Sequence, residues 1–191
     1  MTHVSIIGTG NMGQAIAAVA GRGGHTVQLL GPEDVATVVT GDIVVLAIPY
    51  GAVSSVIAER GDSLVGKIVV DITNPVNFET FDSLSVPADG SATREIAEAL
   101  PRSRVLKALN TTFAATLAAG TVGALTTTVL IAGDDADAKS TLADVLASGG
   151  LKAIDAGPLQ RARELESLGF LQITLAANEK IAWTGGFGIV A

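Results

Sequence analysis

Short apolar runs alternate along the chain with longer segments in which apolar residues recur at every third or fourth position. The strand-like runs cover residues 4–7, 26–30, 43–48, 67–72, 105–109, 127–132 and 151–155. The helix-like segments cover residues 11–21, 50–60, 93–100, 134–148 and 159 to about 181. Continuous apolar strands separated by helices are typical of a sheet that is covered on both faces. The pattern predicts an α/β fold with a doubly wound, mostly parallel sheet and a long C-terminal helix.

Three glycines in the spacing G-x-G-x-x-G join the first strand to the first helix. In this context Gly8 allows a tight turn, Gly10 lets the backbone approach a pyrophosphate, and Gly13 lets the helix pack close to the strand. The free N–H groups at the start of the helix would point at the phosphates. The motif predicts a Rossmann-type domain that binds NAD(P), with a glycine turn in a nucleotide-free protein as the alternative.

The residues after the second strand bear on the choice between NAD and NADP. Glu33 lies 20 residues after Gly13, the usual offset for an acid that binds the ribose, and no Arg or Lys accompanies it. This local charge favours NAD. The alternative is that Glu33 and Asp34 only begin a helical turn.

Composition excludes several other classes of function. The 191 residues carry a formal net charge of −7 with only 12 Lys and Arg, so we expect no nucleic-acid partner. Cysteine is absent, and His and carboxylate residues form no cluster at metal-ligand spacing, so we expect no metal site. No apolar run reaches membrane-spanning length and no signal-peptide pattern precedes the first strand. We therefore expect a cytoplasmic protein with no membrane partner.

Four motifs resemble the deazaflavin-dependent NADP reductase family, which includes the coenzyme F420:NADP oxidoreductases and the reductase domains of STEAP metalloreductases. They are GTGNMG at 8–13, AIPYGAV at 47–53, KALNTTFA at 107–114, and DAGPL at 155–159 followed by the Arg163 and Glu166–Leu168 pattern. The sequence is also similar to short bacterial dinucleotide-binding oxidoreductases of this group, in DITNPVNF at 71–78 and in WTGGF at 183–187.

The resemblance implies NADP at the Gly8–Gly13 loop and hydride exchange with a flat redox ring, a deazaflavin (F420) or a flavin. It implies that Ile48 and Pro49 run beside the dinucleotide and that residues 108–111 border the nicotinamide. The family usually has Ser-Arg or Ser-Lys where this sequence has Pro32 and Glu33. Our candidate cofactor-binding residues are Gly8, Thr9, Gly10, Asn11, Met12, Gly13, Gly31, Pro32, Glu33, Ile48, Pro49, Tyr50, Val53, Asn74, Pro75, Ala108 and Asn110; our candidate substrate-binding residues are Asn110, Thr111, Thr112, Gly185 and Phe187.

Acid–base residues are scarce where the strands end, the edge at which such sheets bind ligands. His3 and His25 precede the first two strands and belong to the opposite edge. Tyr50 is a weak candidate for a catalytic acid, followed by Lys107, although Tyr50 would more often pack against a dinucleotide. Hydride transfer between two stacked heterocycles needs few acid–base side chains, so it fits this scarcity of acid–base residues. The alternatives are a non-catalytic NAD(P)-binding redox sensor and a carbonyl or imine reductase that uses Tyr50.

Two further segments complete the expected site. Residues 1–157 should form the dinucleotide-binding domain, and residues 158–191 a helix and a Gly-rich tail packed on it as part of one structural unit. The loop at 74–92 and this tail would enclose a shallow cleft for the acceptor. Trp183 and Phe187 could equally anchor a homodimer interface.

We expect Arg161, Arg163, Glu164 and Glu166 to form a solvated helix face, and Asp71 and Asp155 to bind backbone turns.

Overall fold

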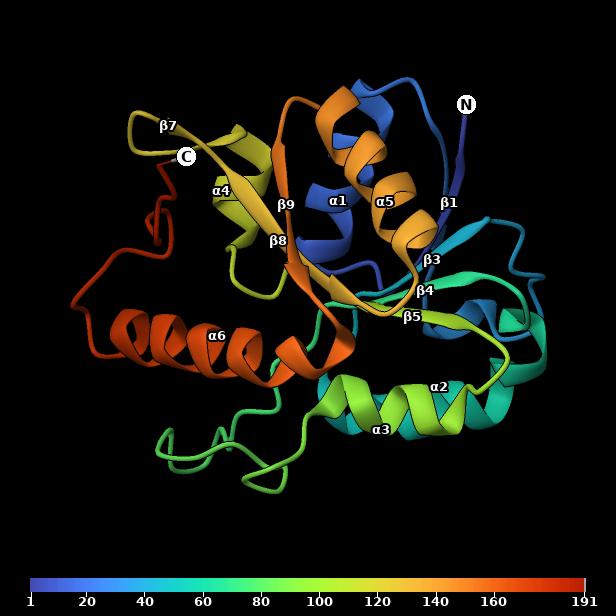
Figure 1. Ribbon diagram of the computed structural model, residues 1–191, viewed down its shortest axis with the longest axis horizontal. Helices are drawn as coiled ribbons and strands as arrows, with labels where there is room; N and C mark the ends of the chain where they lie inside the picture. Colours follow the sequence, from blue (N-terminus) through green and yellow to red (C-terminus); the bar gives the residue numbers. More distant parts are fainter. Residues whose placement is uncertain (191) are drawn as a thin grey trace.

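The computed structural model describes residues 1–190 and contains a seven-stranded sheet in the order β2-β1-β3-β4-β5-β8-β9 (Figure 1). The strands are β1 (His3–Ile7), β2 (Thr26–Leu30), β3 (Ile43–Leu46), β4 (Ile68–Asp71), β5 (Arg104–Lys107), β8 (Thr128–Gly133) and β9 (Lys152–Gly157). Strands β1 to β5 are parallel, β8 is antiparallel to β5, and β9 is parallel to β8. The expected mostly parallel sheet is confirmed. The chain order reverses between β1 and β3, which is where Rossmann-type sheets bind dinucleotides.

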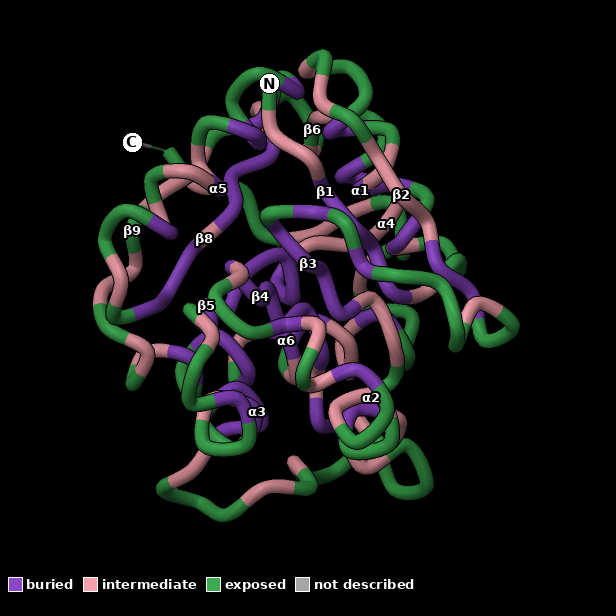
Figure 2. The backbone as a smooth tube through the Cα atoms, turned by 90° about the vertical axis from the view of Figure 1, so that its right-hand side faces the viewer, coloured by how far each residue is buried: buried purple, intermediate pink, exposed green. Residues whose placement is uncertain are grey.

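Helices cover both faces of this sheet (Figure 1). They are α1 (Asn11–Arg22), α2 (Val53–Arg60), α3 (Ala92–Ala99), α4 (Ala114–Ala119), α5 (Ala136–Ser148) and α6 (Ala162–Ala177). Val45 packs into a core with α1, α4 and α5, whereas its neighbour Val44 packs into a second core with α2 and α3. The central strands are accordingly buried throughout (Figure 2). The doubly wound prediction is therefore confirmed, because alternate strand residues face opposite helical layers.

Two elements were not predicted, and one was predicted too long. Helix α4 has only six residues and ends at Gly120, which has a φ of 74°. The hairpin of β6 (Thr121–Val122) and β7 (Leu125–Thr126) is too short to produce a periodic pattern. The last helix ends at Ala177 rather than near residue 181, because Glu179 adopts a left-handed conformation with a φ of 57°. No helix in residues 1–190 is both long and apolar enough to cross a membrane.

A cluster of buried charges joins the middle of the sheet to two helices. Lys107 at the end of β5 places Nζ 2.8 Å from Asp71 Oδ2 on β4 and 3.1 Å from Glu166 Oε1 on α6. All three side chains have no exposed surface. Lys107 Nζ also donates to the carbonyl oxygen of Thr73 at 2.6 Å. Removal of one member of such a cluster typically costs about 3–5 kcal/mol, because the remaining charges stay buried.

The start of α3 completes the cluster. The backbone N–H groups of Ala92 and Thr93 donate to the Glu166 carboxylate at 3.0 and 3.2 Å, and the Thr93 hydroxyl lies 2.7 Å from Asp71 Oδ2. Asp71 also accepts a bond from the N–H of Thr73, so its predicted role at a backbone turn is confirmed. The predicted solvated face is wrong for Glu166, since the N-terminus of α3 and Lys107 attract its carboxylate into the interior.

Candidate functional site

The N-terminus of α1 lies at the carboxyl edge of the sheet and has no side-chain cap among the described residues. Gly8 has a φ of 119°, which turns the chain sharply out of β1. A Cβ atom on Gly13 would overlap the carbonyl oxygen of Gly8, so only glycine lets the helix start this close to the strand. A Cβ on Gly10 would meet nothing within 4 Å. The first amides of α1 are therefore left for an anion that approaches over Gly10.

A cleft of about 490 Å³ opens beside this corner; we call it the β1–β3 cleft. It contains seven of the predicted cofactor-binding residues, namely Gly8, Thr9, Gly10, Gly31, Pro32, Ile48 and Pro49. They come from the ends of β1, β2 and β3, which the register places side by side. Because the carboxyl ends of parallel strands meet at one edge, loops far apart in sequence form a single surface there.

Two acids, Glu33 and Asp34, follow β2 next to Gly31 and Pro32, which line this cleft. Pro32–Asp34 form one 3₁₀ turn, in which Asp34 Oδ2 accepts the N–H of Gly31 at 2.8 Å. The carboxylate of Glu33 folds back over Gly31, where a Cβ would lie 2.6 Å from its Oε1. Its carboxylate therefore lies beside Gly31, which lines the cleft, although Glu33 itself is not among the lining residues.

Arg60 is a cation near this end of the cleft that the sequence did not reveal. It lines the cleft from the end of α2, and its guanidinium donates to the carbonyl oxygens of Thr37, at 2.9 Å, and Asp34. Only 7% of its surface is exposed. It was missed because it comes from α2 rather than from the segment that follows β2. Its guanidinium holds the 32–37 loop in place.

A second cleft of about 460 Å³ lies on the other side of the α1 N-terminus; we call it the β4–β5 cleft. Its walls are Asn11, Met12, Ile72, Asn74, Phe78, Asn110, Thr112, Phe113, Ala114, Ala115, Ile173 and Trp183. Five of these were predicted site residues: Asn11, Met12, Asn74, Asn110 and Thr112. None of the twelve carries a group that titrates near neutral pH. The cleft is suited to an apolar, planar ligand rather than to acid–base chemistry.

Two side-chain amides form the back wall of this cleft. Asn110 Nδ2 donates to Asn74 Oδ1 at 3.0 Å and to the carbonyl oxygen of Leu165 at 2.8 Å, and Asn74 Nδ2 donates to the Asn110 carbonyl at 3.0 Å. Helix α6 can approach this pair only through Gly169, where a Cβ would overlap Asn74 Oδ1. The sequence analysis did not identify this contact; a glycine inside a helical pattern is the signal that could have indicated it.

Aromatic rings form the outer rim of the β4–β5 cleft. The rings of Phe113 and Trp183 have centroids 5.0 Å apart at an angle of 52°. The tail that carries Trp183 is held on α6, where the N–H of Phe187 donates to Gln172 Oε1 at 3.3 Å. It continues toward the β6–β7 hairpin, where Gly188 lies against Leu125 (Figure 1). Of the tail residues, Trp183 lines the cleft, whereas Gly185 and Phe187 do not.

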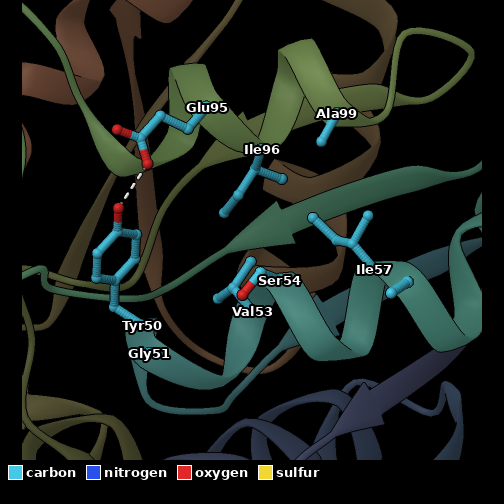
Figure 3. Close-up of a pocket in the computed structure, with 9 residues that line it drawn as sticks. Tyr50, Gly51, Val53, Ser54, Ile57, Glu95, Ile96 and Ala99 are labelled. Atoms are coloured by element: carbon cyan, nitrogen blue, oxygen red, sulfur yellow. Dashed lines mark hydrogen bonds between the residues drawn. The ribbon is translucent and has the colours of Figure 1, made fainter.

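Tyr50 and Val53 line a separate groove of about 400 Å³ between α2 and α3 (Figure 3). The Tyr50 hydroxyl donates to Glu95 Oε2 at 2.5 Å, and the two side chains close one end of the groove. Burial raises the pKa of Tyr50 to about 12, helped by the bond to Glu95 and by the charges of Glu95, Glu166 and Asp71. A raised pKa makes Tyr50 a weaker proton donor.

The remaining predicted residues lie behind these surfaces or outside the site. Ala108 has no exposed surface and Thr111 is 8% exposed, and Pro75 is also buried. His3 and His25 lie at the amino edge of the sheet, as predicted, and bond to Thr40 and Ser148. Asp155 accepts the N–H of Gly157, which confirms its predicted role at a turn, and a bond from Lys139 lowers its pKa.

Comparison with known proteins places this arrangement in a family. Residues 29–75 match the family model described as "NADP oxidoreductase coenzyme F420-dependent". The F420-dependent NADP reductase of Methanocaldococcus jannaschii is 31% identical over 166 residues, which are 85% of this chain and 74% of that protein. This chain belongs to the F420-dependent NADP reductase family. It is therefore an NAD(P)-dependent oxidoreductase, and the family supports NADP binding.

Two other proteins are similar to this member of the family. The rat metalloreductase STEAP3 is 33% identical over 114 residues, 60% of this chain, but that match covers only 22% of STEAP3. A proposed F420-dependent NADP reductase from Arthrobacter sp. FB24 has the same fold, with a TM-score of 0.85 and 24% identity over the whole of both chains. The confirmed family matches the resemblance that the motifs predicted.

Tyr50 gives a direct test of the groove, because it is the only tyrosine in the chain. We expect its phenolate absorbance to appear near pH 12 in the folded protein and near pH 10 in denaturant. Because the pKa of Tyr50 is higher in the folded than in the unfolded state, the protonated phenol contributes to the stability of the folded state. This contribution is complete below pH 10 and is lost as the pH rises toward 12. Spectrophotometric titration of the wild type and of Glu95→Gln checks this, and the variant should titrate at lower pH. An unchanged midpoint would mean that Tyr50 and Glu95 do not interact.

Proposed function

We propose that this protein transfers hydride between NADP(H) and a flat heteroaromatic acceptor of the deazaflavin or flavin class. The observation that carries this proposal is the β4–β5 cleft, whose described walls hold aromatic rings and amides but no titratable side chain. Transfer between two stacked rings requires orientation and exclusion of water more than a protein acid or base.

In this proposal the dinucleotide crosses the N-terminus of α1. The pyrophosphate would accept N–H bonds from the first turn of α1, over Gly10. The adenosine would enter the β1–β3 cleft beside Ile48 and Pro49, and the nicotinamide would enter the β4–β5 cleft beside Met12 and Asn110. When bound, the nicotinamide supplies a hydride, which carries two electrons to the acceptor ring.

The chain's own contribution is a rigid wall and an aromatic rim. Asn74 and Asn110 are hydrogen-bonded to each other, and Asn110 also donates to the carbonyl oxygen of Leu165, so neither amide is free to rotate away from the cleft. Phe113 and Trp183 offer aromatic surface on which an acceptor ring can stack. Ile72 and Ile173 add apolar surface to the same cleft, which would disfavour water beside the stacked rings. The acceptor would then lie opposite the nicotinamide, with Trp183 over its outer face.

The nucleotide preference rests on opposing signals. The family supports NADP, whereas Glu33 beside Gly31 would repel a 2′-phosphate and bind a ribose hydroxyl of NAD. Asp34 and Glu59 add negative charge at the same end of the cleft, and Arg60 is already bonded to two carbonyl oxygens. We propose that the protein uses both dinucleotides and that Glu33 limits the affinity for NADP.

Trp183 reports on the proposed active site because it is the only tryptophan. Its emission overlaps the absorption of reduced nicotinamide, so NADPH in the β4–β5 cleft should quench it by energy transfer. Stopped-flow mixing of the NADPH complex with F420 and with flavins should then consume NADPH. Trp183→Ala should reduce kcat/KM for the acceptor by roughly tenfold, the equivalent of about 1.4 kcal/mol of stacking, while Trp183→Phe retains most of it.

Two results would reject this proposal. One is Trp183 emission that does not change when NADPH is bound, as established by calorimetry. The other is tight NADPH binding without turnover of any ring acceptor, which would favour a redox sensor. Turnover of a carbonyl or imine substrate that Tyr50→Phe abolishes would instead favour the reductase alternative.

Glu33→Arg tests the nucleotide preference. The change removes a carboxylate and places a guanidinium where a 2′-phosphate would lie. We expect the ratio of the NADP dissociation constant to that of NAD to fall at least tenfold, measured by calorimetry. Asp144→Arg, on the exposed surface of α5, changes the net charge equally and should leave the ratio unchanged. A ratio that Glu33→Arg does not alter would show that Glu33 does not face the ribose.

A further inference from the structure

The buried cluster of Asp71, Lys107 and Glu166 lies directly behind the wall of the β4–β5 cleft. Asp71 precedes Ile72, which lines the cleft, so their Cα atoms are about 3.8 Å apart. Glu166 follows Leu165, whose carbonyl oxygen accepts the bond from Asn110. Each acid is thus one residue away from a group that forms or supports the wall.

This cluster contains two carboxylates and one ammonium group. With all three ionised its formal charge is −1. The N–H groups of Ala92 and Thr93 offset part of this charge with the dipole of α3, which is worth about half an elementary charge. Because the three charged side chains have no exposed surface, salt and water screen the remaining negative charge only weakly.

The charges of Asp71 and Glu166 act on at least one group outside the cluster, the Tyr50 hydroxyl. Tyr50 lies after β3, outside the cluster, and its pKa is raised mainly by burial and by Glu95. The charges of Glu166 and Asp71 contribute to the same shift. The two carboxylates therefore act on polar groups beyond their own hydrogen bonds.

The two redox forms of the nicotinamide differ in charge. The oxidised ring is a cation, whereas the reduced ring is neutral. We propose that the Asp71–Lys107–Glu166 cluster stabilises the oxidised ring in the β4–β5 cleft relative to the reduced ring, and so biases the bound cofactor toward donating its hydride. This proposal rests on the proposed function for the position of the nicotinamide. Hydride transfer would carry two electrons to the acceptor ring and leave a positive charge on the nicotinamide, which the negative charge of the cluster would stabilise.

Glu166 is a positioning residue in this scheme. Two substitutions distinguish the effect of its charge from the effect of its size. Glu166→Gln keeps the size and a hydrogen-bond acceptor but removes the charge, whereas Glu166→Asp keeps the charge and shortens the side chain. At an effective dielectric constant of about 20, one charge about 10 Å away changes a dissociation constant by roughly tenfold. Calorimetric titration with NADP+ and with NADPH measures the ratio of the two constants.

We expect Glu166→Gln to weaken NADP+ binding roughly tenfold with little change for NADPH, which raises the midpoint potential of the bound couple. Glu166→Asp should keep the wild-type ratio. Glu164→Gln is the matched control, because Glu164 lies exposed two residues earlier and its charge is screened. Asp71→Asn, which removes a charge from β4 instead of α6, should shift the ratio in the same direction.

These titrations can reject the role of the cluster without rejecting the proposed function. Binding of both dinucleotides with a ratio unchanged in folded Glu166→Gln or Asp71→Asn would overturn only the role of the cluster. Failure of the wild type to bind either dinucleotide would overturn the proposed function itself. If neither variant folds, the wild type decides: the proposal requires NADP+ to bind at least as tightly as NADPH, and tenfold tighter binding of NADPH would reject it.

Discussion

The amide hydrogens at the start of α1 are the constraint on which the site depends. A helix leaves its first N–H groups without partners inside the helix, and no side chain in residues 1–190 caps those of α1. The Gly8 turn and the close packing at Gly13 place these groups at the point where the strand order reverses. The two clefts lie on either side of them, so one anion bound at this point would align a dinucleotide with both.

The charged cluster behind the β4–β5 cleft has a structural role and an electrostatic role. It links β4 and β5 to α3 and α6, the elements that hold Asn74, Asn110 and Leu165. Buried ion pairs seldom stabilise a fold more than apolar residues of the same size would. Their position behind a cleft without titratable side chains accords with the electrostatic role proposed above.

The sequence predicted the fold well because its signals are local. Apolar strands, the glycine motif and helical periodicity each depend on neighbouring residues, and they located the strand ends that line both clefts. It could not predict contacts between distant segments. The sequence predicted an exposed position for Glu166 because charges of opposite sign occur together at residues 161–166. Its partners Lys107 and Ala92 come from other elements and gave no local signal. Arg60 reaches its cleft from the end of α2, a distant segment, and α4 was too short to show a period. The tail was expected at the acceptor cleft, but only the structure shows that Trp183 is the tail residue that lines it.

The most direct test of this cofactor position is a crystal structure of the protein with NADP+ bound. We expect the pyrophosphate within hydrogen-bonding distance of the first amides of α1, and the nicotinamide ring between Met12 and Asn110. Electron density for the pyrophosphate away from the α1 N-terminus would contradict this expectation. So would a nicotinamide ring in the groove between α2 and α3 beside Tyr50.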